Sequence, residues 1–367
     1  MSRTAGRALA AGLVLAAAAA AGLLLREPAA PTRPRVVVVG LDAADWQLLD
    51  DYMAKGAMPE LARLTREGRS GVLRAFVPSL SPLLWTTMMT GRSPLEHRVL
   101  DFTRFHPKTG AREPITSDER LARAVWEIAS EAGRKVAVFG LWATYPAEPV
   151  RGLMVSDRFF AFHRVETELP PGAVSPAAEQ PRLQALRDEV ERSVGAEQLQ
   201  PYIPSLTAPE LQALEARGSP FAHPATALRR ILVETRLYHR LAMDWLPREK
   251  PELAVVYFQG TDSVGHVFAP FAPPRQPSIA PPDFERYGGV PEAYFREVDA
   301  LLGDYRRYAE AAGATLLVVS DHGFLWKEGR PTRPDSQAAA TAGRWHRQDG
   351  LYLVWGRGID AVGTRGQ

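Results

Sequence analysis

The sequence predicts an α/β domain in which helices flank a doubly wound, mostly parallel central sheet. Short apolar runs recur along the chain, and segments with helical periodicity separate many of them. The expected strands span residues 36–41, 71–76, 136–141, 153–156, 254–259, 316–320 and 351–355. The expected helices span 59–67, 83–90, 117–131 and 292–312. Strands that alternate with helices in this way are typical of parallel sheets, because parallel neighbours need long, usually helical, crossovers.

The amino end has the pattern of a membrane-targeting segment. Arg3 and Arg7 precede an uncharged run from residue 8 to residue 25, which is just long enough to span a bilayer. A basic flank on the short side predicts an amino terminus inside and a domain outside the cytoplasm. We therefore expect residues 1–34 to be a signal anchor, or a cleaved signal peptide, followed by a linker. The chain would then be anchored in the inner membrane and face outward, or be secreted or periplasmic after cleavage.

Carboxylates follow three of the expected strands. Asp42 ends the run that begins with valines 36–39, Asp262 follows residues 253–258, and Asp321 follows residues 316–319. The carboxyl ends of parallel strands are where ligands collect, so we expect these side chains to converge at one edge of the sheet. A lone Asp in such a place is also a common helix cap, and Asp42 by itself has that second interpretation.

Histidines near these carboxylates complete two possible half-sites. Asp262 and His266 stand four residues apart, so one helical turn after the strand would aim both at one ion. The adjacent pair Asp321 and His322 can both reach inward at a strand-to-loop corner opened by a glycine, and this second half-site needs Asp42. His346 precedes the last strand, where it could close the first half-site. These side chains are enough for two zinc ions, with Mn²⁺ as the alternative ion.

A nucleophile is predicted at Ser81. This hydroxyl precedes Pro82 at the expected start of a helix, where the positive dipole end favours an alkoxide and a phosphate oxygen. Direct zinc coordination would lower the pKa of the hydroxyl further, so Ser81 is also counted among the metal ligands. Ser79 is the rival hydroxyl, and a role for Ser81 as a helix cap alone is the other interpretation.

Composition excludes several other classes of function. The chain has 367 residues, of which 46% are hydrophobic and 23% charged, so it can bury a sizeable core. Its 44 basic and 42 acidic residues are interspersed without a basic stripe, and we therefore expect no nucleic-acid-binding surface. The absence of cysteine excludes disulfides and thiolate metal sites. Nothing in the sequence indicates an oligomeric state.

These motifs together resemble the alkaline phosphatase superfamily, in the branch of type I phosphodiesterases and nucleotide pyrophosphatases. The resemblance runs from residue 35 to about residue 358, through the motifs GLDAADW (40–46), MPELARL (58–64), GTDSVGH (260–266), SDHG (320–323) and HRQDGLYLVWG (346–356). In that branch a Thr or Ser stands about ten residues before the Gly that ends its helix, which selects Ser81 over Ser79 by counting back from Gly91.

The resemblance implies a ligand set and a domain plan. One zinc would be held by Asp262, His266 and His346. The other would be held by Asp42, Asp321 and His322, and it would face Ser81. The implied fold is alkaline phosphatase-like, with a metallohydrolase core at residues 35–160 and 253–367. Residues 161–252 show helical periodicity without strands, and we expect them to form a helical cap insertion, which this family commonly carries at such a place.

Two departures limit the functional expectation. Nucleotide pyrophosphatases carry an Asn shortly after the serine or threonine helix, whereas residues 100–103 here contain none. The sulfatase motif C/S-x-P-x-R is also missing, because Pro82 follows Ser81 directly and no Arg follows in register.

The expected function is that of an extracytoplasmic two-zinc hydrolase. It would cleave phosphodiester or pyrophosphate bonds of a small phosphorylated substrate through a phosphoseryl intermediate. The alternatives are a phosphomonoesterase, a phosphonate hydrolase, a lipid-headgroup phosphotransferase, or an inactive, membrane-tethered binding domain.

Overall fold

The computed structural model describes residues 34–160, 168–327, 329–331 and 342–362. The segment expected to anchor or export the chain, residues 1–33, lies outside this set. Among the described residues, no helix is both long enough and apolar enough to cross a membrane.

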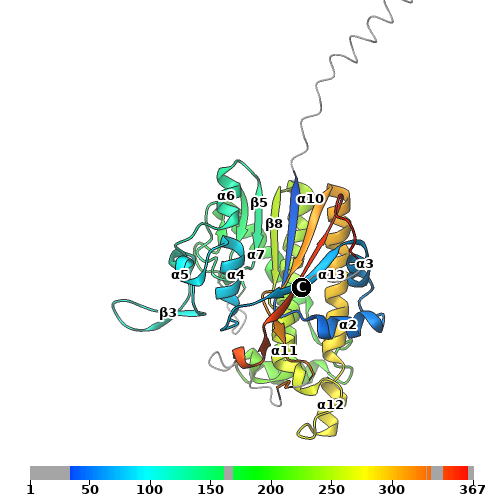
Figure 1. The fold of residues 1–367 in the computed structure, drawn as a ribbon. Coiled ribbons are helices and arrows are strands. Elements are labelled where there is room, and N and C mark those ends of the chain that lie inside the picture. The colour runs from blue at the N-terminus through cyan, green and yellow to red at the C-terminus, as the bar shows by residue number, and fades with distance from the viewer. Residues whose placement is uncertain (1–33, 161–167, 328, 332–341, 363–367) are drawn as a thin grey trace, which may run out of the picture. The chain divides into compact units, whose positions relative to one another are not determined.

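An eight-stranded sheet with the order β2-β12-β9-β1-β8-β5-β6-β7 forms the core (Figure 1). Neighbours from β9 to β6 run parallel, while β12 and β7 pair antiparallel at the two sides. This confirms the predicted mostly parallel α/β sheet flanked by helices. The strands are β1 (Arg35–Leu41), β2 (Arg69–Arg74), β5 (Val136–Phe139), β6 (Gly152–Val155), β7 (Val174–Ser175), β8 (Leu253–Phe258), β9 (Ala314–Val319) and β12 (Asp349–Trp355).

Helices cover both faces of this sheet because successive residues of each strand point to opposite sides. On β1, Val37 and Val39 pack into the larger core, whereas Val38 packs into the smaller one with Trp85 and Trp126. The larger core is formed with α2 (Trp46–Ala54), α3 (Pro59–Glu67), α10 (Pro224–Glu249), α11 (Gly260–Phe268) and α13 (Val290–Ala312). The smaller core is formed with α4 (Ser81–Thr90) and α6 (Val125–Glu131).

Gly40 on β1 lets α4 approach the sheet closely. A Cβ at this position would lie 2.7 Å from the indole ring of Trp85, which is fully buried. A larger residue would therefore push α4 outward. Since Ser81 is the first residue of α4, the packing of Trp85 on Gly40 also fixes where the serine hydroxyl lies relative to the end of β1.

The region expected to be a cap contains α10 and several smaller helices, but also β7, which pairs with β6, so the prediction that this region has no strands is wrong. Its described helices are α7 (Gln180–Ser193), α8 (Ala196–Leu199), α9 (Ala208–Glu215) and α10, with short 3-10 turns. α10 packs directly on β5 and β8 of the central sheet, and α7 packs against α10. Residues 161–167 lie outside the described set. The division of the chain into a core and a cap stays a prediction.

Candidate metal centre and nucleophile

The predicted ligand residues meet at the carboxyl edge of three adjacent strands. Asp42 follows β1, Asp262 lies in the first turn of α11 directly after β8, and Asp321 follows β9. Because β8, β1 and β9 are neighbours and run parallel, their ends bring residues from distant parts of the sequence to one place. The resulting side chains form two groups, each with three possible metal-donor atoms within 4.8 Å of one another.

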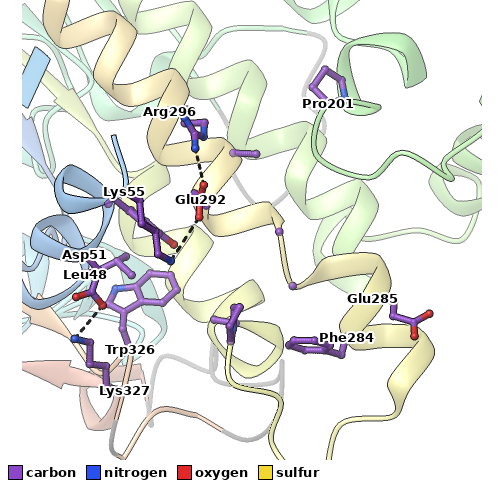
Figure 2. A pocket seen from close by; sticks show the side chains of 16 residues that line it. Leu48, Asp51, Lys55, Pro201, Phe284, Glu285, Glu292, Arg296, Trp326 and Lys327 are labelled. Carbon is purple, nitrogen blue, oxygen red and sulfur yellow. Dashed lines mark hydrogen bonds and ion pairs between the residues drawn. The ribbon is translucent and has the colours of Figure 1, made fainter. Parts of the chain in front are cut away.

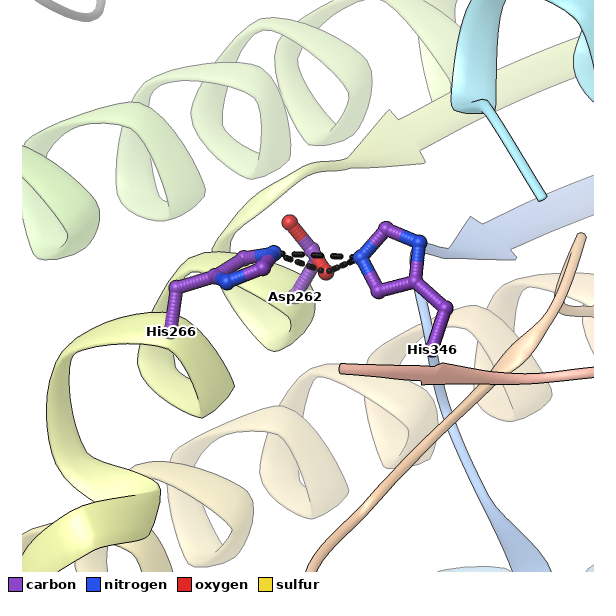
Figure 3. A group of neighbouring side chains, drawn as sticks. All are labelled: Asp262, His266 and His346. Carbon is purple, nitrogen blue, oxygen red and sulfur yellow. Dashed lines mark hydrogen bonds and ion pairs between the residues drawn. The ribbon is translucent and has the colours of Figure 1, made fainter. Parts of the chain in front are cut away.

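The first group consists of Asp262, His266 and His346 (Figure 3). Asp262 Oδ1 lies 3.2 Å from His266 Nε2 and 3.3 Å from His346 Nε2, and the two nitrogens are 3.1 Å apart. The three donor atoms thus point at a common space. His346 comes from β11 (His346–Arg347), which pairs with β10 (Gly323–Phe324), so the last ligand reaches the site through a short hairpin-like pairing.

The second group consists of Asp42, Asp321 and His322, all of which are buried. His322 Nε2 lies 3.3 Å from Asp42 Oδ1 and 3.4 Å from Asp321 Oδ2. The rings of His322 and His346 stack with centroids 3.8 Å apart, so the two groups are direct neighbours.

Backbone carbonyls fix how both of these imidazoles are oriented. His346 Nδ1 lies 2.8 Å from the carbonyl oxygen of Ser79, and His322 Nδ1 lies 3.1 Å from that of Gly323. A carbonyl oxygen only accepts, so each Nδ1 carries the proton and donates it. For His322, this leaves on Nε2 a free lone pair that faces the carboxylates, which is the form in which histidine binds a metal.

Burial of so many carboxylates creates an unbalanced negative charge. Burial raises the pKa of Asp42 well above its ordinary value, and the charges of Asp321 and Asp262 raise it further. Burial also raises the pKa of Asp321 to about 7. Asp262 differs: burial acts to raise its pKa, but the imidazoles of His266 and His346 outweigh burial and lower it well below the ordinary range.

Several of the donor atoms lack a hydrogen-bond partner, and a bound metal ion could take the place of one. Asp262 Oδ1, Asp321 Oδ2 and His322 Nε2 are buried without a hydrogen bond of acceptable geometry. Burial, together with the nearby charge of His346, lowers the pKa of His322 well below its ordinary value, so His322 is neutral as a ligand must be. Divalent ions in the two groups would satisfy these atoms and neutralise the carboxylates.

Ser81 faces the second group. It is the first residue of α4, its side chain is buried, and Oγ donates a hydrogen bond to Asp42 Oδ1 at 3.3 Å. The Ser79 hydroxyl instead donates to the carbonyl oxygen of Phe76 at 3.1 Å. The structure therefore brings Ser81 together with the predicted ligands, while Ser79 contributes only its backbone carbonyl.

Other residues support the second group, and sequence reasoning missed them. Tyr257 donates from its hydroxyl to Asp42 Oδ2, and Thr261 Oγ1 donates to the Asp42 carbonyl at 2.5 Å. The Ala43 N–H donates to Asp321 Oδ1 at 3.3 Å. Tyr257 pairs with Gly40 across β8 and β1. Its place in an apolar strand run indicated only packing, so its polar role had no signal in the sequence.

A buried carboxyl group holds the start of α11, the helix that carries Asp262 and His266. Glu234 on α10 is 2% exposed and accepts a hydrogen bond from the Gln259 N–H at 3.2 Å. The next residue must be small, because a Cβ at Gly260 would lie 2.1 Å from the Tyr294 hydroxyl. α10 and α13 thus enclose the start of α11 from two sides.

A separate hollow of about 590 Å³ lies beside α2 and α13 (Figure 2). Trp326 lines it, and Phe324 lies between this ring and the first group, with ring centroids 5.4 Å from Trp326 and 5.0 Å from His266. Three ion pairs are formed among its charged lining residues: Lys327 with Asp51, and Arg296 and Lys55 with Glu292. None of the residues in the two metal-donor groups lines this hollow.

Comparison with known proteins gives one family match. Residues 36–327 match the family described as type I phosphodiesterase / nucleotide pyrophosphatase. Solved structures of phosphonoacetate hydrolase from Sinorhizobium meliloti 1021 are similar at 18% identity, with a TM-score of 0.46 for the complex with phosphonoformate and 0.44 for that with phosphonoacetate. The alignments cover 80% and 81% of this chain but only 57% and 58% of those chains. No curated protein matches the chain.

Glu234 generates a prediction about pH. Burial raises its pKa to about 8 from an ordinary value of 4.5. Because the folded-state pKa is the higher one, the contribution to stability is fully present below the unfolded-state value and is lost as pH rises towards about 8. In metal-free protein, Glu234→Gln should flatten this decline by up to about 1.4 kcal/mol per pH unit. Urea unfolding of both proteins across this pH range measures the difference, and equal slopes would contradict it.

Proposed function

Since the chain belongs to the type I phosphodiesterase / nucleotide pyrophosphatase family, we propose that it is a two-zinc hydrolase of phosphodiester or pyrophosphate bonds. The observation that carries this proposal is the convergence of two donor groups with the Ser81 hydroxyl against one of them. The substrate class follows from the family and from this centre.

Each donor group would hold one ion. Asp262, His266 and His346 offer two nitrogens and a carboxylate oxygen, and Asp42, Asp321 and His322 offer two carboxylates and one nitrogen. Nitrogen and oxygen donors of this kind suit zinc, and Mn²⁺ is the alternative for the more carboxylate-rich group. When bound, the ions would supply Lewis-acid stabilisation of the phosphoryl oxygens and lower the pKa of the nucleophile and of the attacking water.

Ser81 would act as the nucleophile. Its Oγ would form a bond to phosphorus, the ester or pyrophosphate oxygen would leave, and water would then cleave the phosphoseryl bond and regenerate the hydroxyl. Asp42 Oδ1 accepts the hydroxyl hydrogen in the resting structure, so a route for the proton begins at this contact. The start of α4 adds the positive end of a helix dipole beside the developing negative charge.

A panel of model substrates tests the reaction class. The panel contains bis-p-nitrophenyl phosphate, p-nitrophenyl phosphate, phenylphosphonate and a sulfate ester, each assayed with added zinc or manganese. We expect two metal equivalents per chain and the fastest turnover with the diester. Faster turnover of the monoester would favour a phosphomonoesterase over a diesterase, and faster turnover of the phosphonate would favour a phosphonate hydrolase. Metal binding without any turnover would favour the inactive binding domain. A lipid-headgroup phosphotransferase would transfer the phosphoryl group to an added alcohol faster than to water.

Single substitutions should remove the two ions separately. Asp262→Ala or His346→Ala should lose one ion, and Asp42→Ala or Asp321→Ala should lose the other, because each group has three donors and no spare ligand. Elemental analysis after dialysis gives the metal content. Asp304→Ala, a half-exposed carboxylate paired with Arg307, serves as the control and should keep both ions. Retention of two ions by all four ligand variants would show that the ligand assignment is wrong.

The nucleophile assignment separates Ser81 from Ser79. Ser81→Ala should lower turnover by at least about 1,000-fold, because it removes covalent catalysis, yet leave the ions bound by their protein donors. Ser79→Ala removes only the hydrogen bond to the Phe76 carbonyl and should change turnover little. Mass spectrometry of acid-quenched enzyme should find phosphate on the peptide that contains Ser81. A dead Ser79→Ala variant, or a fully active Ser81→Ala variant, would exclude this nucleophile.

We also propose that the catalytic domain lies outside the cytoplasm. The support comes from the sequence alone: Arg3 and Arg7 precede the apolar run at residues 8–25. A reporter that works only outside the cytoplasm, fused after Gln367, should be active. A signal from a cytoplasmic reporter at the same place would reject this topology.

A further inference from the structure

A partly buried ion pair, Asp45 with Arg347, joins segments that carry the predicted ligands. Asp45 is 2% exposed, and its Oδ2 accepts from Arg347 Nη1 at 2.5 Å. The same carboxylate accepts from the Gln47 N–H at 2.7 Å, where it caps α2, and from the Phe324 N–H at 3.3 Å. One side chain thus joins three segments that are distant in sequence.

Each of these segments carries ligands of the proposed metal centre. Asp45 lies three residues after Asp42 in the turn that follows β1. Phe324 lies in β10, shortly after Asp321 and His322, and Arg347 is the residue next to His346 in β11. The contacts of Asp45 therefore connect the backbone around four of the six ligand residues.

The fit around the Asp45 carboxylate is tight. A Cβ at Gly323 would lie 2.5 Å from Asp45 Oδ2 and 2.4 Å from the carbonyl oxygen of Asp349, so only glycine fits there. Gly323 pairs with Arg347, and Phe324 pairs with His346, in the β10–β11 ladder. The ion pair therefore fixes the register through which His346 reaches the first group.

Stability alone does not explain this ion pair, in which Asp45 is buried and the Arg347 side chain is 22% exposed. Removing a carboxylate and a guanidinium from water costs about as much as their attraction returns, so buried pairs are often replaceable by apolar residues. A pair in this position is better explained by the geometry that it imposes on the segments it joins. None of the donor atoms of the proposed metal centre belongs to Asp45 or Arg347.

We propose that the Asp45–Arg347 ion pair is a positioning device that holds together the turn after β1, β10 and β11, so that both donor groups are preformed for their ions. The inference rests on the proposed two-metal function. In this role, Asp45 and Arg347 do not contact the substrate. Their effect is exerted through Asp42, Asp321, His322 and His346.

The test compares this pair with another partly buried ion pair elsewhere in the fold. Arg306 on α13 and Glu60 on α3 form an ion pair with an Nε–Oε2 distance of 2.8 Å, and neither lies in a segment that carries a ligand. Glu60→Gln is therefore the matched control for Asp45→Asn. Arg347→Met removes the other partner, and Arg347→Lys keeps the charge. The measurements are metal retention against a chelator series, thermal unfolding of the metal-free protein, and kcat and KM with bis-p-nitrophenyl phosphate.

We expect Asp45→Asn and Arg347→Met to retain metal about 10-fold to 100-fold more weakly than the wild type, as removal of a supporting residue behind metal ligands does. The value of kcat should fall more than KM rises. Glu60→Gln should lower the unfolding temperature of the metal-free protein comparably and yet keep wild-type metal retention. Arg347→Lys should restore part of the retention, because an ammonium group can still meet Asp45.

Two results would overturn the proposal. The first is wild-type metal retention and kcat in Asp45→Asn or, should that variant not fold, in Arg347→Met. The second is an equal loss of metal in Glu60→Gln, which would trace the effect to general stability. Failure of the proposed function would look different, because the wild-type protein itself would then bind no metal or hydrolyse no ester.

Discussion

The structure depends on one electrostatic constraint, which is the burial of Asp42, Asp262 and Asp321 close together. Charged carboxylates removed from water repel one another strongly. The protein balances Asp262 with two imidazoles, and the pKa of that carboxyl is lowered accordingly. The imidazole beside Asp42 and Asp321 is that of His322, whose own pKa is lowered, and burial raises the pKa of both carboxyl groups. Positive charge at this place would lower the free-energy cost of burying the carboxylates, and the two groups are therefore candidate metal-binding sites. Buried carboxylates this close together lower the stability of the fold.

The strand order of the sheet brings Asp42, Asp262 and Asp321 together. β8, β1 and β9 are parallel neighbours, so the backbone ladders fix the strand ends from which the three carboxylates follow. Gly40 removes the side chain that would keep Trp85 away, and α4 then places the Ser81 hydroxyl against Asp42. The precision of the site therefore comes from the rigid packing of apolar side chains on both faces of the sheet.

Hydrogen bonds from outside the two groups set the chemical state of the donors. The Ser79 and Gly323 carbonyls hold the Nδ1 protons of His346 and His322, and Tyr257 holds one oxygen of Asp42. Without these partners the imidazoles could rotate or change tautomer, and the lone pairs would no longer converge. Asp45 and Arg347 act one step further out, where they join the segments themselves.

The sequence by itself determined the fold class, seven of the eight strands of the central sheet and the set of residues that converge, because apolar runs mark strands and the ends of parallel strands share an edge. It missed β7, a strand of only two residues with no apolar run. It also indicated which ligands pair up, since Asp262 and His266 stand one helical turn apart. It indicated nothing about the partners that orient these ligands. Tyr257 lies hidden in an apolar strand, and Asp45 and Arg347 meet across 302 residues of sequence. Such contacts depend on how helices and strands pack in three dimensions, and no local pattern encodes them. The sequence also favoured Ser81 over Ser79, and only the tertiary structure decided how Ser79 takes part. Its backbone carbonyl accepts from His346, a contact between residues 267 positions apart that depends on how the segment before α4 packs against β11.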